Sequence, residues 1–170
     1  MKPLKFSHGP FEVCEPNPSD LNHIIVHMRA ADKQEVFDSH GWTPRQAVLG
    51  AQVASECKMV LRKNGSAMAF FGISRSAEFD LDTACVWLLG TGAIDANWLP
   101  FCRIMKKVLR AIHAHYPTLF NFVGAENIKY IRWLSWIGAH ICTPTRHGHI
   151  KKPFCYFTLT RRTPCVLRSL

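Results

Sequence analysis

The chain has 170 residues, of which 48% are hydrophobic and 19% are charged. This composition favours one well-packed globular domain and excludes a largely disordered chain. The formal net charge of +9 favours anionic partners such as nucleic acid, phosphate-rich cofactors or acidic protein surfaces, without choosing among them.

The first half of the chain predicts one short strand followed by helices. The strand covers 11–15, where apolar and polar residues alternate. Helices are expected over 21–28, 31–40 and 44–56, the second with Val36 and Phe37 turned inward. Thr43 is suited to cap the third helix, and Pro44 fits its first turn.

A β-hairpin is predicted next, because Asn64-Gly65 separates the apolar runs 57–62 and 67–73. Both residues of this dipeptide tolerate the positive φ that a two-residue hairpin turn requires. The segment 79–83 is expected to be a loop or a short strand. The apolar run 84–89 is too short for a helix and predicts a buried central strand.

The second half predicts a helix-rich crossover. A helical period runs over 97–115, with one apolar face and one basic face that carries Arg103, Lys106, Lys107 and Arg110. A strand is expected at 119–123 and a second amphipathic helix at 127–137. The runs 139–142 and 154–160 predict closing strands across a loop.

This order of elements predicts an α+β mixed sheet with helices on both faces. The strand–helix–strand unit within 84–123 should be a right-handed parallel crossover. Our central structural hypothesis is that its two strands lie side by side, splay apart, and leave a gap faced by the amino end of the long helix.

The cysteine pattern indicates a reduced, intracellular protein. None of the seven cysteines forms a C-x-x-C pair, and most lie in apolar runs. The amino-terminal residues lack the apolar core of a signal peptide, and no stretch is long enough to span a membrane. The pairs His113/His115 and His147/His149 lack companions at zinc-ligand spacing, so no metal site is expected.

The segment 121–140 resembles the fifth strand and following helix of GNAT acetyltransferases, in which an Asn opens the helix and a Gly ends it. Asn127 and Gly138 hold those places. A closer resemblance is to bacteriophage proteins known as internal virion protein A or phage acetyltransferase-like proteins. It rests on the motifs Trp87-Leu-Leu-Gly-Thr91, Ile131-Arg-Trp-Leu134 and Asp32-Lys-Gln-Glu-Val36, and on the basic helix. The resemblance implies one GNAT-like domain over 1–160 and a basic tail over 161–170.

A GNAT enzyme binds the pyrophosphate of acetyl-CoA on backbone N–H groups where a strand meets a helix. The resemblance implies that acetyl-CoA would contact Leu88, Leu89, Gly90, Thr91, Gly92 and Asn127. The family's Arg or Gln falls on Trp87, which cannot replace it, and Asp95 adds a negative charge nearby. Two interpretations stay open: a degenerate cofactor loop, or a tight turn that simply needs glycine.

Catalytic residues are harder to identify. The Tyr that commonly serves as general acid in this fold should lie seven residues after Asn127, and Leu134 is there instead. Tyr130, one turn earlier, is the candidate that remains. Candidates for a general base are Glu78, Asp80 and Asp82 before the central strand, and Glu35 and His40 farther away.

Two functions are compatible with these residues. The favoured one is a phage virion-associated or assembly protein in the host cytoplasm or the virion, with virion proteins as partners. The basic clusters are then a solvated face, or a surface that contacts nucleic acid. This function predicts no saturable binding of acetyl-CoA. The alternative is an acetyl-CoA-dependent N-acetyltransferase acting on a protein or small amine, which predicts micromolar, stoichiometric binding.

Overall fold

A computed structural model describes residues 1–75 and 82–161 of the chain. Its centre is a mixed sheet with the strand order β1-β2-β3-β4-β5-β6-β9-β7, and β8 also pairs with β9. The strands are β1 (Phe6–His8), β2 (Phe11–Cys14), β3 (Cys57–Lys63), β4 (Ser66–Ser74), β5 (Thr83–Gly90), β6 (Thr118–Gly124), β7 (His140–Ile141), β8 (Thr145–His147) and β9 (Lys152–Thr160). The helices are α1 (Pro18–His27), α2 (Ala30–His40), α3 (Pro44–Ala54), α4 (Ala93–Ala96), α5 (Trp98–Ile112) and α6 (Ile128–Ile137).

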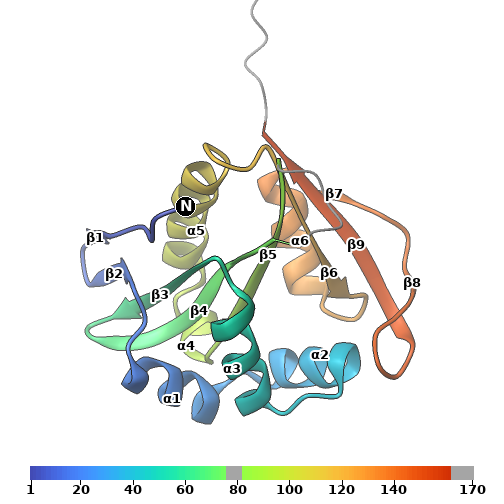
Figure 1. The fold of residues 1–170 in the computed structure, drawn as a ribbon, viewed down its shortest axis with the longest axis horizontal. Helices are drawn as coiled ribbons and strands as arrows, with labels where there is room; N and C mark the ends of the chain where they lie inside the picture. Colours follow the sequence, from blue (N-terminus) through green and yellow to red (C-terminus); the bar gives the residue numbers. More distant parts are fainter. Residues whose placement is uncertain (76–81, 162–170) are drawn as a thin grey trace, which may run out of the picture.

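Helices cover both faces of the sheet (Figure 1). On one face, α1 and α3 pack against the sheet through a cluster that contains Ile24, Val48 and Phe70. On the other face, α5 and α6 contribute residues such as Phe101 and Leu134 to the larger core. The predicted α+β class, with a mixed sheet between two helical layers, is therefore confirmed.

Local sequence explains where the helices of the first face begin. At α1, the Asn17 side chain accepts a hydrogen bond from the N–H of Asp20 at 2.9 Å, and the Asp20 carboxylate accepts one from the N–H of Asn17 at 2.8 Å. Thr43 and Gln46 make the same reciprocal pair at α3, where Thr43 is the predicted cap. Such pairs satisfy backbone donors that the helix itself cannot.

The predicted hairpin joins β3 and β4. Asn64 has φ of 49° and Gly65 has φ of 81°, the left-handed conformations that a two-residue turn demands. The two strands pair antiparallel, with one shift of register between Leu61 and Arg62. The dipeptide thus forms the turn from which this pairing begins.

The central hypothesis concerns the parallel strands β5 and β6, which are neighbours in the sheet as expected. They pair over three residues only, Thr83–Cys85 of β5 with Thr118–Phe120 of β6. Beyond that point β5 stays paired with β4, and β6 stays paired with β9. The two strands therefore diverge, which confirms the predicted splay.

Helix α2 differs from the expectation. Phe37 is 48% exposed, whereas Asp32 and Asp38 are buried. The prediction that Phe37 turns inward is wrong, because this helix directs carboxylates toward partners on other elements. The sequence also missed β1, α4 and β8, each of which has four residues or fewer.

Some predictions lie outside the described residues, namely those for Glu78 and Asp80, for most of the segment 79–83, and for the tail beyond Arg161. None of the helices in the described residues has the length and apolar character that crossing a bilayer requires.

Candidate active site

A cavity of about 110 Å³ lies where β5 and β6 diverge, under α5 and α6. Its wall is mostly apolar and includes Trp87, Tyr130 and Trp133. The indole N–H groups of both Trp residues and the hydroxyl of Tyr130 are buried, and no described residue hydrogen-bonds to them. Buried polar groups without partners are uncommon in folded proteins and cost free energy. Their concentration around one cavity indicates a site for a ligand that supplies hydrogen-bond acceptors.

Asn121 spans the gap just beyond the last residue pair that joins the two strands. Its side-chain Nδ2 donates to the carbonyl oxygen of Val86 at 2.7 Å, and its Oδ1 accepts from the N–H of Phe122 at 2.7 Å. A side chain here replaces the backbone ladder that the splay removes.

Tyr130 and Leu134 lie one turn apart on α6, and both line the cavity. Leu134 has no proton to donate, so only Tyr130 brings a hydroxyl to this wall. Burial holds the pKa of Tyr130 far above its usual value, although the nearby Arg29 guanidinium opposes this shift. The Arg29 guanidinium lies 4.5 Å from the centre of the Tyr130 ring. The hydroxyl is therefore protonated at every physiological pH and can act only as a donor or a neutral acceptor.

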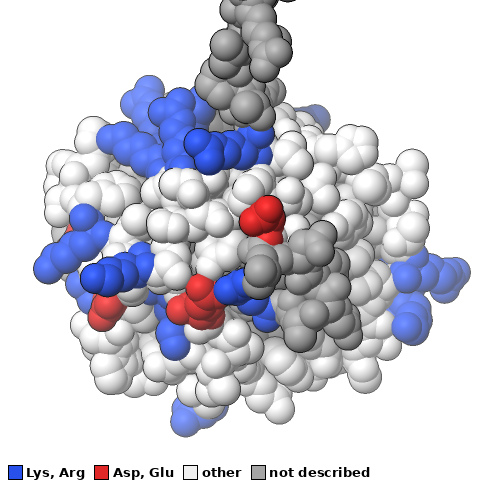
Figure 2. All heavy atoms as spheres, turned by 45° about the horizontal axis from the view of Figure 1, so that its top comes forward, with Lys and Arg blue, Asp and Glu red and all other residues white. Residues whose placement is uncertain are grey.

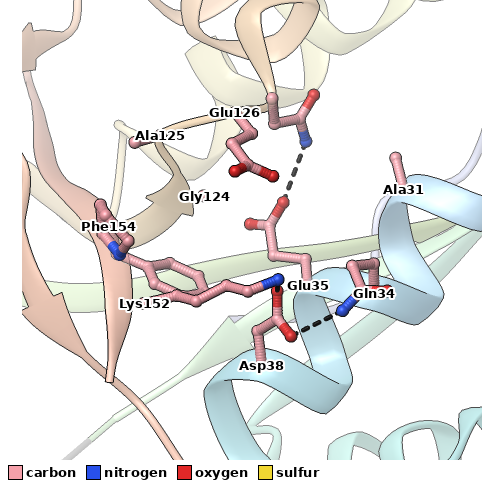
Figure 3. A pocket seen from close by; sticks show the side chains of 11 residues that line it. Ala31, Gln34, Glu35, Asp38, Gly124, Ala125, Glu126, Lys152 and Phe154 are labelled. Carbon is pink, nitrogen blue, oxygen red and sulfur yellow. Dashed lines mark hydrogen bonds and ion pairs between the residues drawn. The ribbon is translucent and has the colours of Figure 1, made fainter. Parts of the chain in front are cut away.

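Glu35 stands between the cavity and a second, more open pocket of about 230 Å³, since it lines both. Its Oε2 accepts a hydrogen bond from the Asn127 side chain at 2.9 Å (Figure 3). Burial raises the pKa of Glu35, whereas the Asn127 amide and the Gly124 N–H lower it. A half-buried carboxylate with a raised pKa, at the junction of two pockets, has the position and chemistry of a general base.

The pocket on the other side of Glu35 is acidic. Asp38 and Glu126 line it together with Glu35, from α2 and from the turn after β6. Figure 3 shows the Glu35 and Glu126 carboxyl groups directed toward the same space. Lys152 is the one cation of the lining, and its Nζ pairs with Asp38 at 3.0 Å. The remaining negative charge favours a cationic guest.

The turn after β5 is occupied by internal hydrogen bonds. The N–H of Gly90 donates to the Asp32 carboxylate at 2.6 Å, and the N–H of Thr91 donates to the Met68 carbonyl at 2.8 Å. The N–H of Gly92 has no partner in the described part of the chain. A Cβ on Gly90 would lie 2.3 Å from Ile94 Cδ1 and 3.2 Å from Arg29 Nε, so any other residue there would force the Ile94 side chain to move.

Asp32 belongs to a buried ion pair that sequence reasoning missed. Arg29 and Asp32 are 8% and 6% exposed, and the guanidinium contacts both carboxylate oxygens. Burial raises the pKa of Asp32, while Arg29 and the Gly90 N–H oppose that shift. The backbone N–H of Arg29 also donates to the Gly90 carbonyl at 2.9 Å. The start of α2 is thereby bound to the end of β5.

A wider groove of about 770 Å³ runs between the first half of α5 and nearly the whole length of α6, and we call it the basic groove. Its lining comprises Trp98, Leu99, Cys102, Arg103, Ile128, Lys129, Arg132, Trp133 and Trp136. Lys129 pairs with Asp95 and lies 4.4 Å from the Trp98 ring centre. Arg103 and Arg132 form no ion pair with any of the residues that the structure describes. Trp133 lines this groove and the cavity, so the two adjoin.

The residues expected to contact a cofactor thus divide into three groups. Leu88 lines the cavity and Asn127 the acidic pocket. Leu89 is buried in the core on the α1 face. The turn residues form the third group: the amides of Gly90 and Thr91 are engaged within the protein, and that of Gly92 has no partner among the described residues.

Among the candidates for a base that the structure describes, only Glu35 lines the cavity. Asp82 precedes β5, at the end where β5 and β6 are still paired. His40 stacks on Trp42, with 4.8 Å between the ring centres. Glu35 could have been ranked higher from sequence had the place of α2 beside the splay been known.

No family model and no curated protein matches this sequence. Solved structures do match. A GNAT-family acetyltransferase from Bacillus anthracis superposes with a TM-score of 0.69 at 10% identity, over 92% of this chain and 98% of that one. The ribosomal-protein-S18-alanine N-acetyltransferase from Escherichia coli superposes with a TM-score of 0.62 at 15% identity, over 94% of this chain and 99% of that one.

A putative acetyltransferase from Salmonella typhimurium, solved with its cofactor acetyl-CoA, gives a TM-score of 0.62 at 13% identity, over 92% of this chain and 99% of that one. At these identities the likeness concerns the fold, and the chain has the GNAT fold. Nothing in these comparisons supports the resemblance to phage internal virion proteins.

Proposed function

We propose that this protein is an acetyl-CoA-dependent N-acetyltransferase whose acceptor is a positively charged primary amine. The observation that carries the proposal is the position of Glu35, a carboxylate with a raised pKa that separates an apolar cavity from an acidic pocket. The acidic pocket would admit an ammonium group, and the cavity would admit the acyl end of the donor. This choice reverses the preference for a non-enzymatic assembly protein that the sequence alone favoured.

Each residue then has a definite part. Glu35 would remove a proton from the incoming ammonium group, and Asn127 would keep the carboxylate oriented through its 2.9 Å hydrogen bond. The Tyr130 hydroxyl would donate a hydrogen bond where negative charge develops. Acetyl-CoA, when bound, supplies an activated acyl thioester: the free amine would form the new C–N bond as the C–S bond breaks, and the thiolate would leave as the thiol with the second proton that the nitrogen loses.

The cofactor would be held differently from the glycine-loop pattern. Two of the loop amides are engaged by Asp32 and Met68, so they offer little to a pyrophosphate. The basic groove instead presents Arg103 and Arg132, which suit phosphate groups because guanidinium donates paired hydrogen bonds. The three unpaired donors around the cavity support the fit of the polar pantetheine arm.

Acetyl-CoA binding tests this proposal directly. We expect calorimetry at physiological salt to give one saturable site with a micromolar Kd. The variant Arg103→Ala/Arg132→Ala should weaken binding at least about tenfold, since each charge-assisted contact contributes more than a neutral one. The control Lys33→Ala/Arg45→Ala, on the opposite helical layer, should bind as the native protein does. Absence of saturable binding to the native protein would refute the proposal and restore the assembly interpretation.

The variant Tyr130→Phe should separate activity from stability. Removing a buried hydroxyl that lacks a partner should leave the free energy of unfolding unchanged or raise it by up to about 1 kcal/mol. Loss of the hydrogen-bond donor should lower kcat by about 10²-fold if the hydroxyl acts in the reaction. Urea unfolding and initial-rate assays measure the two effects. A kcat equal to that of the native enzyme would remove Tyr130 from the mechanism.

A further inference from the structure

The charged residues of α5 and α6 are all basic. Together these helices carry Arg103, Lys106, Lys107, Arg110, Lys129 and Arg132, and neither contains an Asp or a Glu. In the sequence from Thr83 onward, twelve Lys and Arg residues stand against only two acidic ones, Asp95 and Glu126. The net charge of the molecule therefore resides in the half that builds this helical layer.

A third hollow lies on that layer, and we call it the Trp136 groove. It measures about 480 Å³ and is lined by the last turns of α5, the end of α6 and the end of β9. Among the described residues, its charged lining consists of Lys106, Arg110 and Arg161 and includes no carboxylate. Figure 2 shows Lys and Arg side chains gathered beside the end of the described chain, with the visible Asp and Glu side chains outside this group.

Trp136 adds an aromatic surface to this charge. It is 59% exposed, whereas Trp133 on the same helix is buried. The Lys106 ammonium lies 5.1 Å from the centre of the Trp136 ring. An exposed indole beside cations provides the two elements that single-stranded nucleic acid needs, a stacking platform for a base and charges for the phosphates.

We propose that the Trp136 groove binds single-stranded nucleic acid. Lys106, Arg110 and Arg161 contact the phosphates, and a base stacks on Trp136. An acidic protein segment would also match the charge and could pack on the indole, but a base stacks on it whatever the sequence, while its phosphates meet the cations on either side. Trp136 also lines the basic groove, whereas Lys106, Arg110 and Arg161 line neither that groove nor the acidic pocket. The charge-reversal variant therefore tests this proposal without changing Arg103 or Arg132, the proposed contacts of the cofactor.

The test is fluorescence anisotropy with a labelled oligouridylate of about 12 nucleotides, a length within the roughly 4–16 nucleotides that one single-strand-binding module covers. Binding should be saturable at about 50 mM salt and weaken with a log–log salt slope of about −2, as three phosphate contacts predict. The variant Lys106→Glu/Arg110→Glu should weaken binding at least about tenfold. Trp136→Ala should weaken it about tenfold with the salt slope unchanged, and Trp136→Phe should restore most of the affinity.

The matched control is Lys33→Glu/Arg45→Glu, which makes the same change of charge on exposed residues of α2 and α3. It should retain more than half of the native affinity. Equal weakening by both charge reversals would mean that only net charge matters, and it would overturn the proposal. Displacement of the oligonucleotide by polyglutamate at equal charge concentration would overturn it in favour of an acidic protein partner. Circular dichroism of every variant verifies that it is folded.

Discussion

Replacing Glu35 with Gln is expected to lower kcat for acetyl transfer by about 10²- to 10⁴-fold, the range for loss of a general base. Gln keeps the length of the side chain and can still accept the hydrogen bond from Asn127, but it cannot accept the proton of the ammonium group. The KM for acetyl-CoA should change little, because the donor is bound on the other side of Glu35. Steady-state rates at saturating donor measure the effect.

Glu126→Gln is the matched control for that experiment. Glu126 lines the same acidic pocket but is exposed and stands farther from the cavity, which it does not line. Its loss should raise the KM for a cationic acceptor while kcat stays within about twofold, since one exposed charge contributes little. Comparable losses of kcat in both variants would show that the pocket needs only negative charge and that Glu35 is no base.

The pH dependence of activity is a second test of the role of Glu35. A base must be deprotonated, so activity should rise with pH through the folded-state pKa, which lies above the usual value of 4.5 because of burial. The charged neighbours Asp32 and Arg29 act on Glu35 in opposite directions. A raised carboxyl pKa also means that its contribution to stability is full at low pH and is lost as the pH rises through that pKa. In Glu35→Gln, the fall of activity at low pH should therefore disappear. The free energy of unfolding of this variant should also increase relative to that of the native protein as the pH rises.

Removing Asp32 is expected to cause the largest loss of stability. Asp32→Ala leaves the buried Arg29 guanidinium without its counter-charge and the Gly90 N–H without an acceptor. Breaking one partner of a buried pair typically costs about 3–5 kcal/mol. For a chain of this size that corresponds to a fall in Tm of roughly 10 °C. Thermal and urea unfolding measure it.

Two further variants identify the cause of that loss. The exposed ion pair of Arg75 with Glu56 spans 3.7 Å, so Arg75→Ala should cost under about 1 kcal/mol. The double variant Arg29→Met/Asp32→Leu removes both charges and should recover part of the stability, though the Gly90 N–H remains unpaired. A cost for Asp32→Ala no larger than for Arg75→Ala would show that the buried pair contributes nothing to the fold.

Much of the fold follows from local sequence. Thr43-Pro44 marks the start of α3, and Asn64-Gly65 marks the hairpin, because each pattern has a direct backbone reason. The short apolar run of β5 and the amphipathic period of α5 then require a parallel crossover. Such features depend on residues a few positions apart, and they were predicted correctly.

The site depends on distant residues and was predicted less well. The hydrogen bond from Gly90 to Asp32 joins residues 58 positions apart, and the one from Asn127 to Glu35 joins residues 92 apart. No local pattern encodes such pairs. The apolar Phe37 suggested the wrong inner face for α2, which instead buries Asp32 and Asp38. A carboxylate can be buried when hydrogen-bond or ion-pair partners on other elements compensate it, and such partners cannot be seen in the local sequence. Tyr130 and Leu88 were named from the sequence, and both lie on the cavity wall.

The three-residue seam between β5 and β6 gives the molecule a mechanical character. The sheet has two parts, one ending at β5 and the other beginning at β6. They are joined by this three-residue pairing and by the hydrogen bond from the Asn121 side chain to Val86. A small rotation about the seam is magnified toward Gly90 and Gly124, at the far ends of the two strands. Glu35 and Tyr130 both line the cavity at that wide end, so a change in the angle between β5 and β6 would change the distance between their side chains.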